Sequence, residues 1–208
     1  MLKMIIIKFK THQRVNIMKQ LLMIISLLLV SSKLYAKCVT LENQSENVVL
    51  TWTAFKTPAK VGVNGSFDKI TLKTPKNGSS IGDFVSKTTF EIDSKSVNTK
   101  NKARDMKIAE NFFSFANDSK ITGKFLSMKN KTLEVEITMN GQTKVVPMAY
   151  VDNEDKNTFV ARGHIDVFDF LLNGQLSAIN KACYALHKGK TWSDVALKLE
   201  AKLSNCKK

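Results

Sequence analysis

The feature of this sequence that most constrains its fold is a strict alternation of apolar and polar residues in two segments. In residues 132–139, "TLEVEITM", every second side chain is apolar and the others are Thr or Glu. Residues 195–203, "VALKLEAKL", repeat this alternation with Lys and Glu on the polar side. Because successive side chains of a strand point to opposite faces, this period predicts a sheet with one apolar face and one solvated face.

Turn signals suggest how such strands are connected. Asn140-Gly141, between residues 132–139 and 142–151, predicts a two-residue hairpin turn. Further strands are predicted at Val48–Phe55, Lys60–Lys73, Phe84–Ile92, Ile121–Met128 and Asn157–Ile165. About eight antiparallel strands favour an up-and-down barrel, because closure removes the exposed edges of a sheet. We therefore expect an all-β fold with two short helices and an eight-stranded antiparallel β-barrel, its interior either filled by side chains or holding one slender ligand.

Two segments have helical spacing instead. Residues 174–189, "GQLSAINKACYALHKG", repeat apolar positions every three or four residues and end at Gly189, a common helix stop. Residues 101–115, "NKARDMKIAENFFSF", combine charges with two adjacent phenylalanines, which suits a membrane-surface helix, a nucleic-acid contact or a cover over an apolar interior. Lys100 and Lys102 oppose the dipole of this second helix, so tertiary contacts must stabilise it. The flanking barrel strands favour the cover.

Residues 1–36 resemble an export signal. All their charges are positive, and they contain the apolar run "LLMIISLLLV" before Ala36. A basic start, an apolar run of about 7–15 residues and a small residue at the cut are typical of a secretory signal peptide. The run is shorter than the roughly 20 residues that span a membrane. We predict a signal peptide over residues 1–36, with Met18 as an alternative start, and a single domain over residues 37–208 that is periplasmic or secreted.

Export changes the charge that matters. The chain carries +14, and six of its cations lie in residues 1–36 without an acidic residue, so 14 − 6 leaves +8 on the mature domain. This excess is spread along the domain, mostly as Lys. It suits transient attraction to an anionic membrane, without stable insertion. Nucleic acid is not a predicted partner of an exported chain that lacks a binding motif.

Three cysteines remain in the mature domain: Cys38, Cys183 and Cys206. An oxidising compartment allows one pair to form a disulfide. The first and last strands of an up-and-down barrel are neighbours, so the topology favours Cys38–Cys206 as that pair.

No catalytic or metal-binding pattern stands out. The sequence contains no GxSxG, HExxH or P-loop motif, and His164 and His187 lie far apart without nearby clusters of ligands. Glu134 and Glu136 fall on the solvated face of their strand, while Asp166 and Asp169 suit caps of a turn or helix. We expect no metal, no cofactor and no enzymatic activity.

Other residues are better suited to binding. Val48, Leu50, Trp52, Ala54 and Lys56 share one face of the predicted strand 48–55 and its end. If this face lines the interior, Lys56 lies near the mouth and meets a polar or anionic head group. The alternative is a core Trp52 with Lys56 on the rim.

The cover helix offers a second set of candidates. Arg104 either contacts a head group or pairs with Asp105 or another acid. Phe112, Phe113 and Phe115 either anchor the helix to the core or close an open barrel end.

Four quoted segments together resemble a known family: "AFKTPAKVGVNGSFDKI", "TTFEIDSKSVNTKNKARDMKIAENFF", "LEVEITMNGQTKVVPMAY" and "ARGHIDVFDF". Their order and spacing over most of residues 48–203 resemble the YceI-like family, also called the polyisoprenoid-binding family. The middle segment is the most specific, with Ser96, Thr99 and Arg104-Asp105 before the double phenylalanine. Two features depart from the family: Lys56 stands where many members have a histidine, and residues 180–194 are longer.

The resemblance implies an exported, lipocalin-like eight-stranded barrel with an elongated apolar interior. It implies a binder of long-chain amphiphiles such as polyisoprenoids, isoprenoid quinones or fatty amides, without a shared catalytic motif. The resemblance leaves a homodimer open, although no apolar stripe predicts one. The leading hypothesis is a periplasmic carrier of a long isoprenoid-type lipid; the alternative is an interaction protein with a side-chain-filled barrel and a basic surface. The candidate ligand-binding residues are Trp52, Lys56, Phe67, Phe90, Ile92, Arg104, Phe112, Phe113, Ile137 and Met139.

Overall fold

The computed structural model describes residues 37–114 and 119–207. The chain divides into two units, residues 1–36 and 37–208. The predicted signal peptide, its alternative start at Met18 and the side chain of Phe115 lie outside the described residues. No helix within the described part of the chain is long and apolar enough to cross a membrane.

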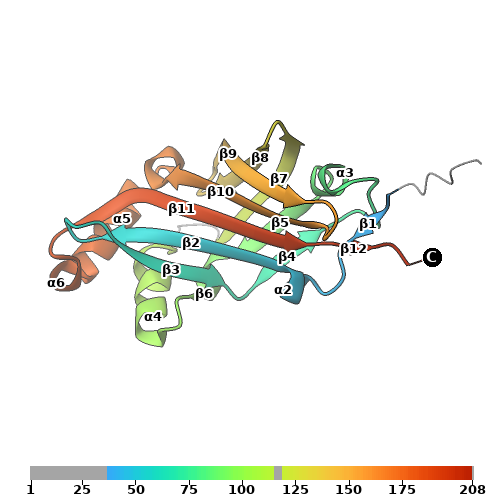
Figure 1. Cartoon of the computed structure of the whole chain (residues 1–208). Helices are drawn as coiled ribbons and strands as arrows, with labels where there is room; N and C mark the ends of the chain where they lie inside the picture. Colours follow the sequence, from blue (N-terminus) through green and yellow to red (C-terminus); the bar gives the residue numbers. More distant parts are fainter. Residues whose placement is uncertain (1–36, 115–118, 208) are drawn as a thin grey trace, which may run out of the picture. The chain divides into compact units, whose positions relative to one another are not determined.

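Strands are the commonest secondary structure among the described residues (Figure 1). One antiparallel sheet has the order β4-β5-β7-β8-β9-β10-β11-β2-β3-β6, and β1 pairs with β12 in a second, two-stranded sheet. The strands are β1 (Val39–Thr40), β2 (Val48–Lys56), β3 (Val61–Phe67), β4 (Ile70–Lys73), β5 (Thr89–Asp93), β6 (Val97–Asn98), β7 (Lys120–Lys129), β8 (Thr132–Met139), β9 (Gln142–Asn153), β10 (Thr158–Asp166), β11 (Thr191–Lys202) and β12 (Ser204–Asn205).

The large sheet has ten strands within the described residues, where the sequence predicts about eight. The predicted strand 60–73 is divided at Asp68 and Lys69 into β3 and β4. Residues 89–98 are likewise divided into β5 and β6 by the 3-10 helix η1 (Ser94–Ser96). Because β3 pairs with β2 and β6 while β4 pairs with β5, two segments only two residues apart lie near opposite ends of the strand order. The sheet is therefore curled.

The helices gather toward the two ends of this sheet (Figure 1). One end carries α4, α5 and α6, and the other carries α3 beside β1 and β12. The helices are α2 (Gln44–Asn47), α3 (Ile81–Val85), α4 (Lys102–Asn111), α5 (Asn173–Ala182) and α6 (Tyr184–His187), with the 3-10 helix η2 (Val167–Phe170). The predicted helix at 101–115 is present as α4, whereas the one at 174–189 divides at Cys183 into α5 and α6.

The prediction of a strand beginning at Phe84 was wrong, because Phe84 lies in α3. Local capping explains the difference. The Ser80 hydroxyl accepts a hydrogen bond from the Asp83 backbone N–H at 3.0 Å, and the Asp83 carboxylate accepts one from the Ser79 N–H at 2.9 Å. These bonds satisfy donors that a helix start leaves free, so they favour a helical turn before the strand. Strand β5 then begins at Thr89.

The alternation in residues 132–139 gives the predicted two faces. Its four apolar side chains are buried, while Glu134 accepts a hydrogen bond from Ser127 and Glu136 pairs with Lys124 on the outer face. The predicted turn is also confirmed, since Asn140 and Gly141 have φ values of 50° and 70° between β8 and β9. Both residues adopt the left-handed conformation that this hairpin turn requires.

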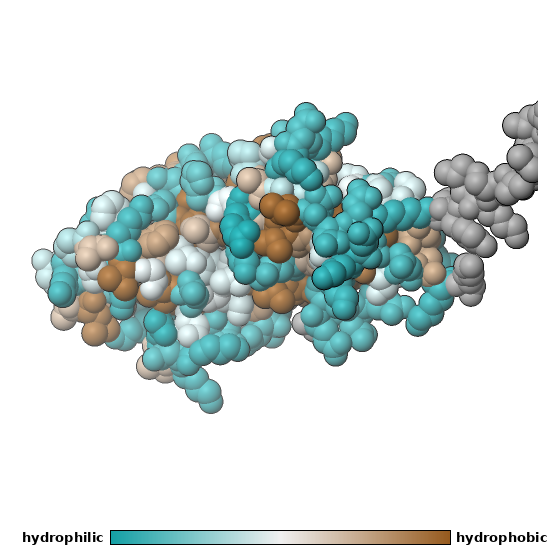
Figure 2. Space-filling view, in the orientation of Figure 1, coloured by the Kyte–Doolittle hydropathy of each residue, from teal (hydrophilic) through white to brown (hydrophobic). Residues whose placement is uncertain are grey.

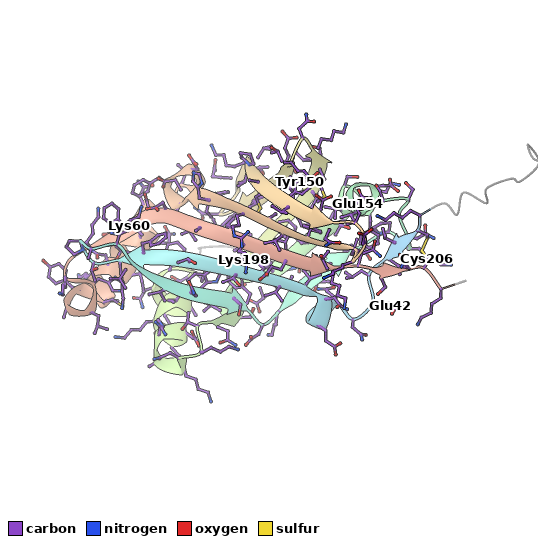
Figure 3. All side chains as sticks on the ribbon, in the orientation of Figure 1. Glu42, Lys60, Tyr150, Glu154, Lys198 and Cys206 are labelled. Carbon is purple, nitrogen blue, oxygen red and sulfur yellow. A yellow bond between two sulfur atoms is a disulfide. The ribbon has the colours of Figure 1, made fainter. Side chains whose placement is uncertain are left out.

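The ends of the described unit are joined covalently. A disulfide links Cys38 and Cys206, with the two Sγ atoms 1.97 Å apart, and the Cys206 N–H donates to the Cys38 carbonyl at 3.1 Å. Figure 3 places Cys206 at the end of the sheet away from Lys60. Cys183 is a buried free thiol.

Candidate functional site

A cavity of about 540 Å³ lies among the inward-facing side chains of the curled sheet. Inward residues such as Leu50, Val195 and Leu197 line it and are only half-buried, because they face open space. The walls are mostly aliphatic and aromatic. A cavity of this size argues against an interior filled by the protein's own side chains, which was the alternative from sequence.

The cavity is elongated along β2. Val48 and Lys56, the two ends of that strand, both line it, and eight residue steps of about 3.3 Å separate them by about 26 Å. Leu50, Trp52 and Ala54 complete the lining face of this strand. The predicted shared face of residues 48–56 therefore points inward along its full length.

Aromatic side chains form much of one wall. The rings of Phe67 on β3 and Phe113 pack edge-on at 5.7 Å between centroids, and Phe113 meets Phe112 in the same way at 5.1 Å. Phe113 is 7% exposed. Trp52 lies 6.4 Å from Phe67, and its indole rests on Gly65, where any side-chain carbon would collide with the ring. The double phenylalanine thus faces the interior, as a cover would.

All ten candidate binding residues from the sequence line this one cavity. Their participation in binding stays a prediction. They are Trp52, Lys56, Phe67, Phe90, Ile92, Arg104, Phe112, Phe113, Ile137 and Met139.

Helix α4 is held at its start by a polar network. The Asn101 side chain accepts a hydrogen bond from the Arg104 backbone N–H at 3.0 Å and caps the helix. Asp105 accepts bonds from the N–H and hydroxyl of Thr99, at 2.8 and 2.6 Å. Arg104 Nε donates to the same hydroxyl at 2.9 Å. Thr99 therefore links Arg104 to Asp105, and within the described residues Arg104 is in no ion pair.

The mouth of the cavity lies between α4 and α6. Most lining residues are buried or half-buried, but Asn101, Ala103, Lys107 and Leu186 are exposed. Asn101 caps α4, Ala103 and Lys107 belong to that helix, and Leu186 belongs to α6. Thr74 is the one exposed lining residue elsewhere in the described chain. The longer segment 180–194 noted from the sequence therefore contributes to this mouth.

Polar side chains converge just inside the mouth. His187 Nδ1 lies 2.6 Å from the Thr191 hydroxyl, which donates to Asn180 Oδ1 at 2.9 Å. Thr191 is directly opposite Lys56 in the β2–β11 ladder. Burial first, and then the positive charges of Lys56 and Lys107, lower the pKa of His187 below its usual value. None of the described lining residues is Asp or Glu.

The sequence alone did not identify several lining residues. His187, Thr191, Trp192 and Lys107 all line the cavity. A signal existed for His187, because it follows the apolar Cys183 by four residues and so falls on the same helical face. Thr191 and Trp192 offered no such signal, since their positions depend on pairing with β2.

Comparison with known families identifies the chain. Residues 40–203 match the family model described as YceI-like domain. The chain belongs to the YceI-like family. A search of curated proteins found no match.

Three solved structures resemble this YceI-like chain. A polyisoprenoid binding domain from Saccharophagus degradans, implicated in plant cell wall breakdown, is 14% identical with a TM-score of 0.56, covering 82% of this chain and 99% of that one. BcnA of Burkholderia cenocepacia is also 14% identical, with a TM-score of 0.50 and coverage of 76% and 96%. The Campylobacter jejuni YceI protein is 22% identical, with a TM-score of 0.48 and coverage of 71% and 87%. At these identities, the first two support the fold alone.

Proposed function

We propose that this protein binds the hydrocarbon chain of a long isoprenoid-type lipid in its cavity and carries it through the periplasm. The elongated, mostly apolar cavity carries the proposal, because it has the form that a single long chain requires. Burying apolar surface contributes about 25 cal/mol per Å², less the cost of ordering the chain. The name of the Saccharophagus degradans domain, which states polyisoprenoid binding for that protein, supports the same ligand class.

We propose that the curled sheet forms a lipocalin-like barrel of eight strands. Counting β3 with β4 as one strand, and β5 with β6 as another, reduces the ten strands of the large sheet to eight. The main-chain bonds from the Asp68 N–H to the Ser96 carbonyl, at 2.9 Å, and from the Asp93 N–H to the Lys69 carbonyl, at 3.1 Å, support that count. They connect the two divided strands across their breaks. An eight-stranded barrel is wide enough to hold one slender ligand.

The mouth has a surface suited to an anionic membrane, the source from which a lipid would be taken. Met106, Tyr184 and Leu186 are exposed by 59%, 66% and 64%. Figure 2 shows hydrophobic side chains at the surface of the end where α6 lies. Six exposed lysines lie in or next to α4, α5 and α6, and none of them is in an ion pair within the described residues. They are Lys100, Lys102, Lys107, Lys181, Lys188 and Lys190. Apolar side chains among lysines fit transient contact with anionic lipid head groups.

Organic extraction of purified protein, followed by mass spectrometry, tests the ligand class. We expect a long-chain isoprenoid-type lipid in the extract, and its uptake again by delipidated protein. Leu197→Trp should reduce uptake because it fills the cavity. Lys198→Trp is the matched control, since it adds the same ring on the adjacent, outward-facing residue. Protein that repeatedly yields no lipid and takes none up would refute the proposal.

Flotation with anionic vesicles tests the membrane contact separately. Replacing Met106 and Tyr184 with Ser should weaken binding to phosphatidylglycerol vesicles, and added salt should weaken it further. Val151→Ser removes an equally exposed apolar residue, 70% exposed, from β9 and should leave binding unchanged. An equal loss of vesicle binding in both variants would contradict the proposal that the mouth contacts the membrane.

A further inference from the structure

Cationic side chains surround the inner mouth without a lining carboxylate. Lys56 from β2 and Lys107 from α4 line the cavity with His187 of α6. Two acids of the adjoining elements are engaged elsewhere: Asp194 of β11 pairs with Lys60 at 2.8 Å, and Asp105 of α4 binds Thr99. Arg104 of α4 also lines the cavity. The remaining charged residues of α4, α5, β11 and the loop before β11 are Lys102, Glu110, Lys181, Lys188, Lys190, Lys198, Glu200 and Lys202. The charged side chains among the described lining residues are therefore all cationic, which suits an anion.

A hydrogen-bond chain determines which nitrogen of His187 carries the proton. The amide of Asn180 is oriented by its donation to the Gly189 carbonyl at 3.2 Å, so its oxygen accepts from Thr191. The single hydroxyl proton of Thr191 is then used, and His187 Nδ1 must donate to Thr191 rather than accept. In the neutral ring Nε2 is left unprotonated, and it has no hydrogen-bond partner within the described residues. This nitrogen is the one available for protonation.

We propose that the cluster of Lys56, Lys107 and His187 binds the anionic head group of the lipid and that His187 takes up a proton at Nε2 when it does. The proposal rests on the lipid-binding function above and specifies its ligand: a single-chain lipid with a phosphate, sulfate or carboxylate head. The tail occupies the apolar cavity, and the head stays at the mouth between α4 and α6.

The direction of the pH dependence follows from the charges. In the free protein, burial and the two lysines lower the pKa of His187, so the ring is neutral near pH 7. An anion beside the ring offsets the lysine charges and raises this pKa. Between the two pKa values binding takes up a proton, so affinity strengthens as pH falls and weakens as pH rises, by at most about tenfold per pH unit for one proton.

Calorimetric titration with hexadecyl sulfate and hexadecanol, below micelle-forming concentrations, separates head from tail. The sulfate keeps one charge throughout the working pH range, so any proton uptake belongs to the protein. We expect the sulfate to bind about tenfold more tightly than the alcohol near pH 6, as charge-assisted bonds to the cluster would give. Titration in buffers of different ionisation enthalpy should show fractional proton uptake for the sulfate only. Inorganic sulfate alone should show neither comparable affinity nor uptake.

Matched variants assign the proton. His187→Asn keeps an N–H where Nδ1 donates to Thr191 but cannot become charged, so it should abolish proton uptake and the pH dependence. His164→Asn removes an exposed histidine outside this cavity and should change neither. Lys107→Gln, on the exposed side of α4, should weaken the sulfate several-fold and spare the alcohol. Lys102→Gln is its control, because Lys102 does not line the cavity.

The outcomes are distinguishable. Equal affinity for sulfate and alcohol, proton uptake that persists in His187→Asn, or a site that takes inorganic sulfate as well as the lipid would each overturn the head-group proposal. Binding of neither lipid would instead refute the proposed function itself.

Discussion

Lengthening a saturated ligand chain by one methylene at a time should strengthen binding until the cavity is full. Burying one methylene contributes about 0.8 kcal/mol, or about a fourfold fall in Kd. The cavity volume of about 540 Å³ sets the limit. A methylene is about as large as a water molecule, whose share of liquid volume is about 30 Å³, so about 18 chain carbons fill the space. Further carbons remain in water and should add little.

Intrinsic fluorescence can measure this series directly. Both tryptophans of the chain, Trp52 and Trp192, line the cavity, so a bound chain changes their surroundings. A series of alkyl sulfates that brackets the limiting length gives Kd against carbon number. We expect the logarithm of Kd to fall steeply with carbon number and then to level off once the cavity is full. Leu197→Phe, which fills space without adding an indole, should make Kd level off at a shorter chain. A slope below about twofold per carbon, or no break, would refute the reasoning.

Three further predictions concern stability. Replacing both cysteines of the disulfide with Ser should cost up to about 5 kcal/mol in urea unfolding, because the bond closes a 168-residue separation; an unchanged midpoint would contradict this. Gly65→Ala should destabilise by about 1–3 kcal/mol and alter Trp52 fluorescence through overpacking, whereas Gly174→Ala, with open space around it, should do neither. A hydrogen bond from Lys131, 2.6 Å away, is the main cause lowering the pKa of Asp152, which is ionised when folded. Stability should therefore fall as pH drops through that pKa, and Asp152→Asn should flatten the acid limb of a thermal unfolding profile.

The part of the site that the sequence predicted comes from strand periodicity. Trp52, Ile137 and Met139 were placed on apolar strand faces, and curling the sheet brings those faces together around one cavity. Their convergence can be predicted from the antiparallel order of the strands alone. Phe112 and Phe113 were predictable for a similar reason, because adjacent large aromatics after a charged helix require burial somewhere close.

The mouth was not predictable in the same way. Strand β11 shifts register against β2 between Thr191 and Val195, and alternation cannot reveal such an irregularity. Trp192 also donates its indole N–H to the Thr57 carbonyl at 2.8 Å, across 135 residues of sequence. The prediction of a strand at Phe84 was wrong for a local reason. The apolar pattern suggested a strand, but the hydrogen bond between Ser80 and Asp83 caps a helix there.

The disulfide between Cys38 and Cys206, which flank the paired strands β1 and β12, has a mechanical consequence. It joins the two ends of the described unit at the side away from α4 and α6 (Figure 3). A pulling force applied before Cys38 and after Cys206 would pass through the sulfur–sulfur bond. The strands of the sheet, which lie between the two cysteines in the sequence, would then carry no load. Under oxidising conditions the cavity would keep its form in a stretched chain, and only reduction would let force reach the strands that enclose it.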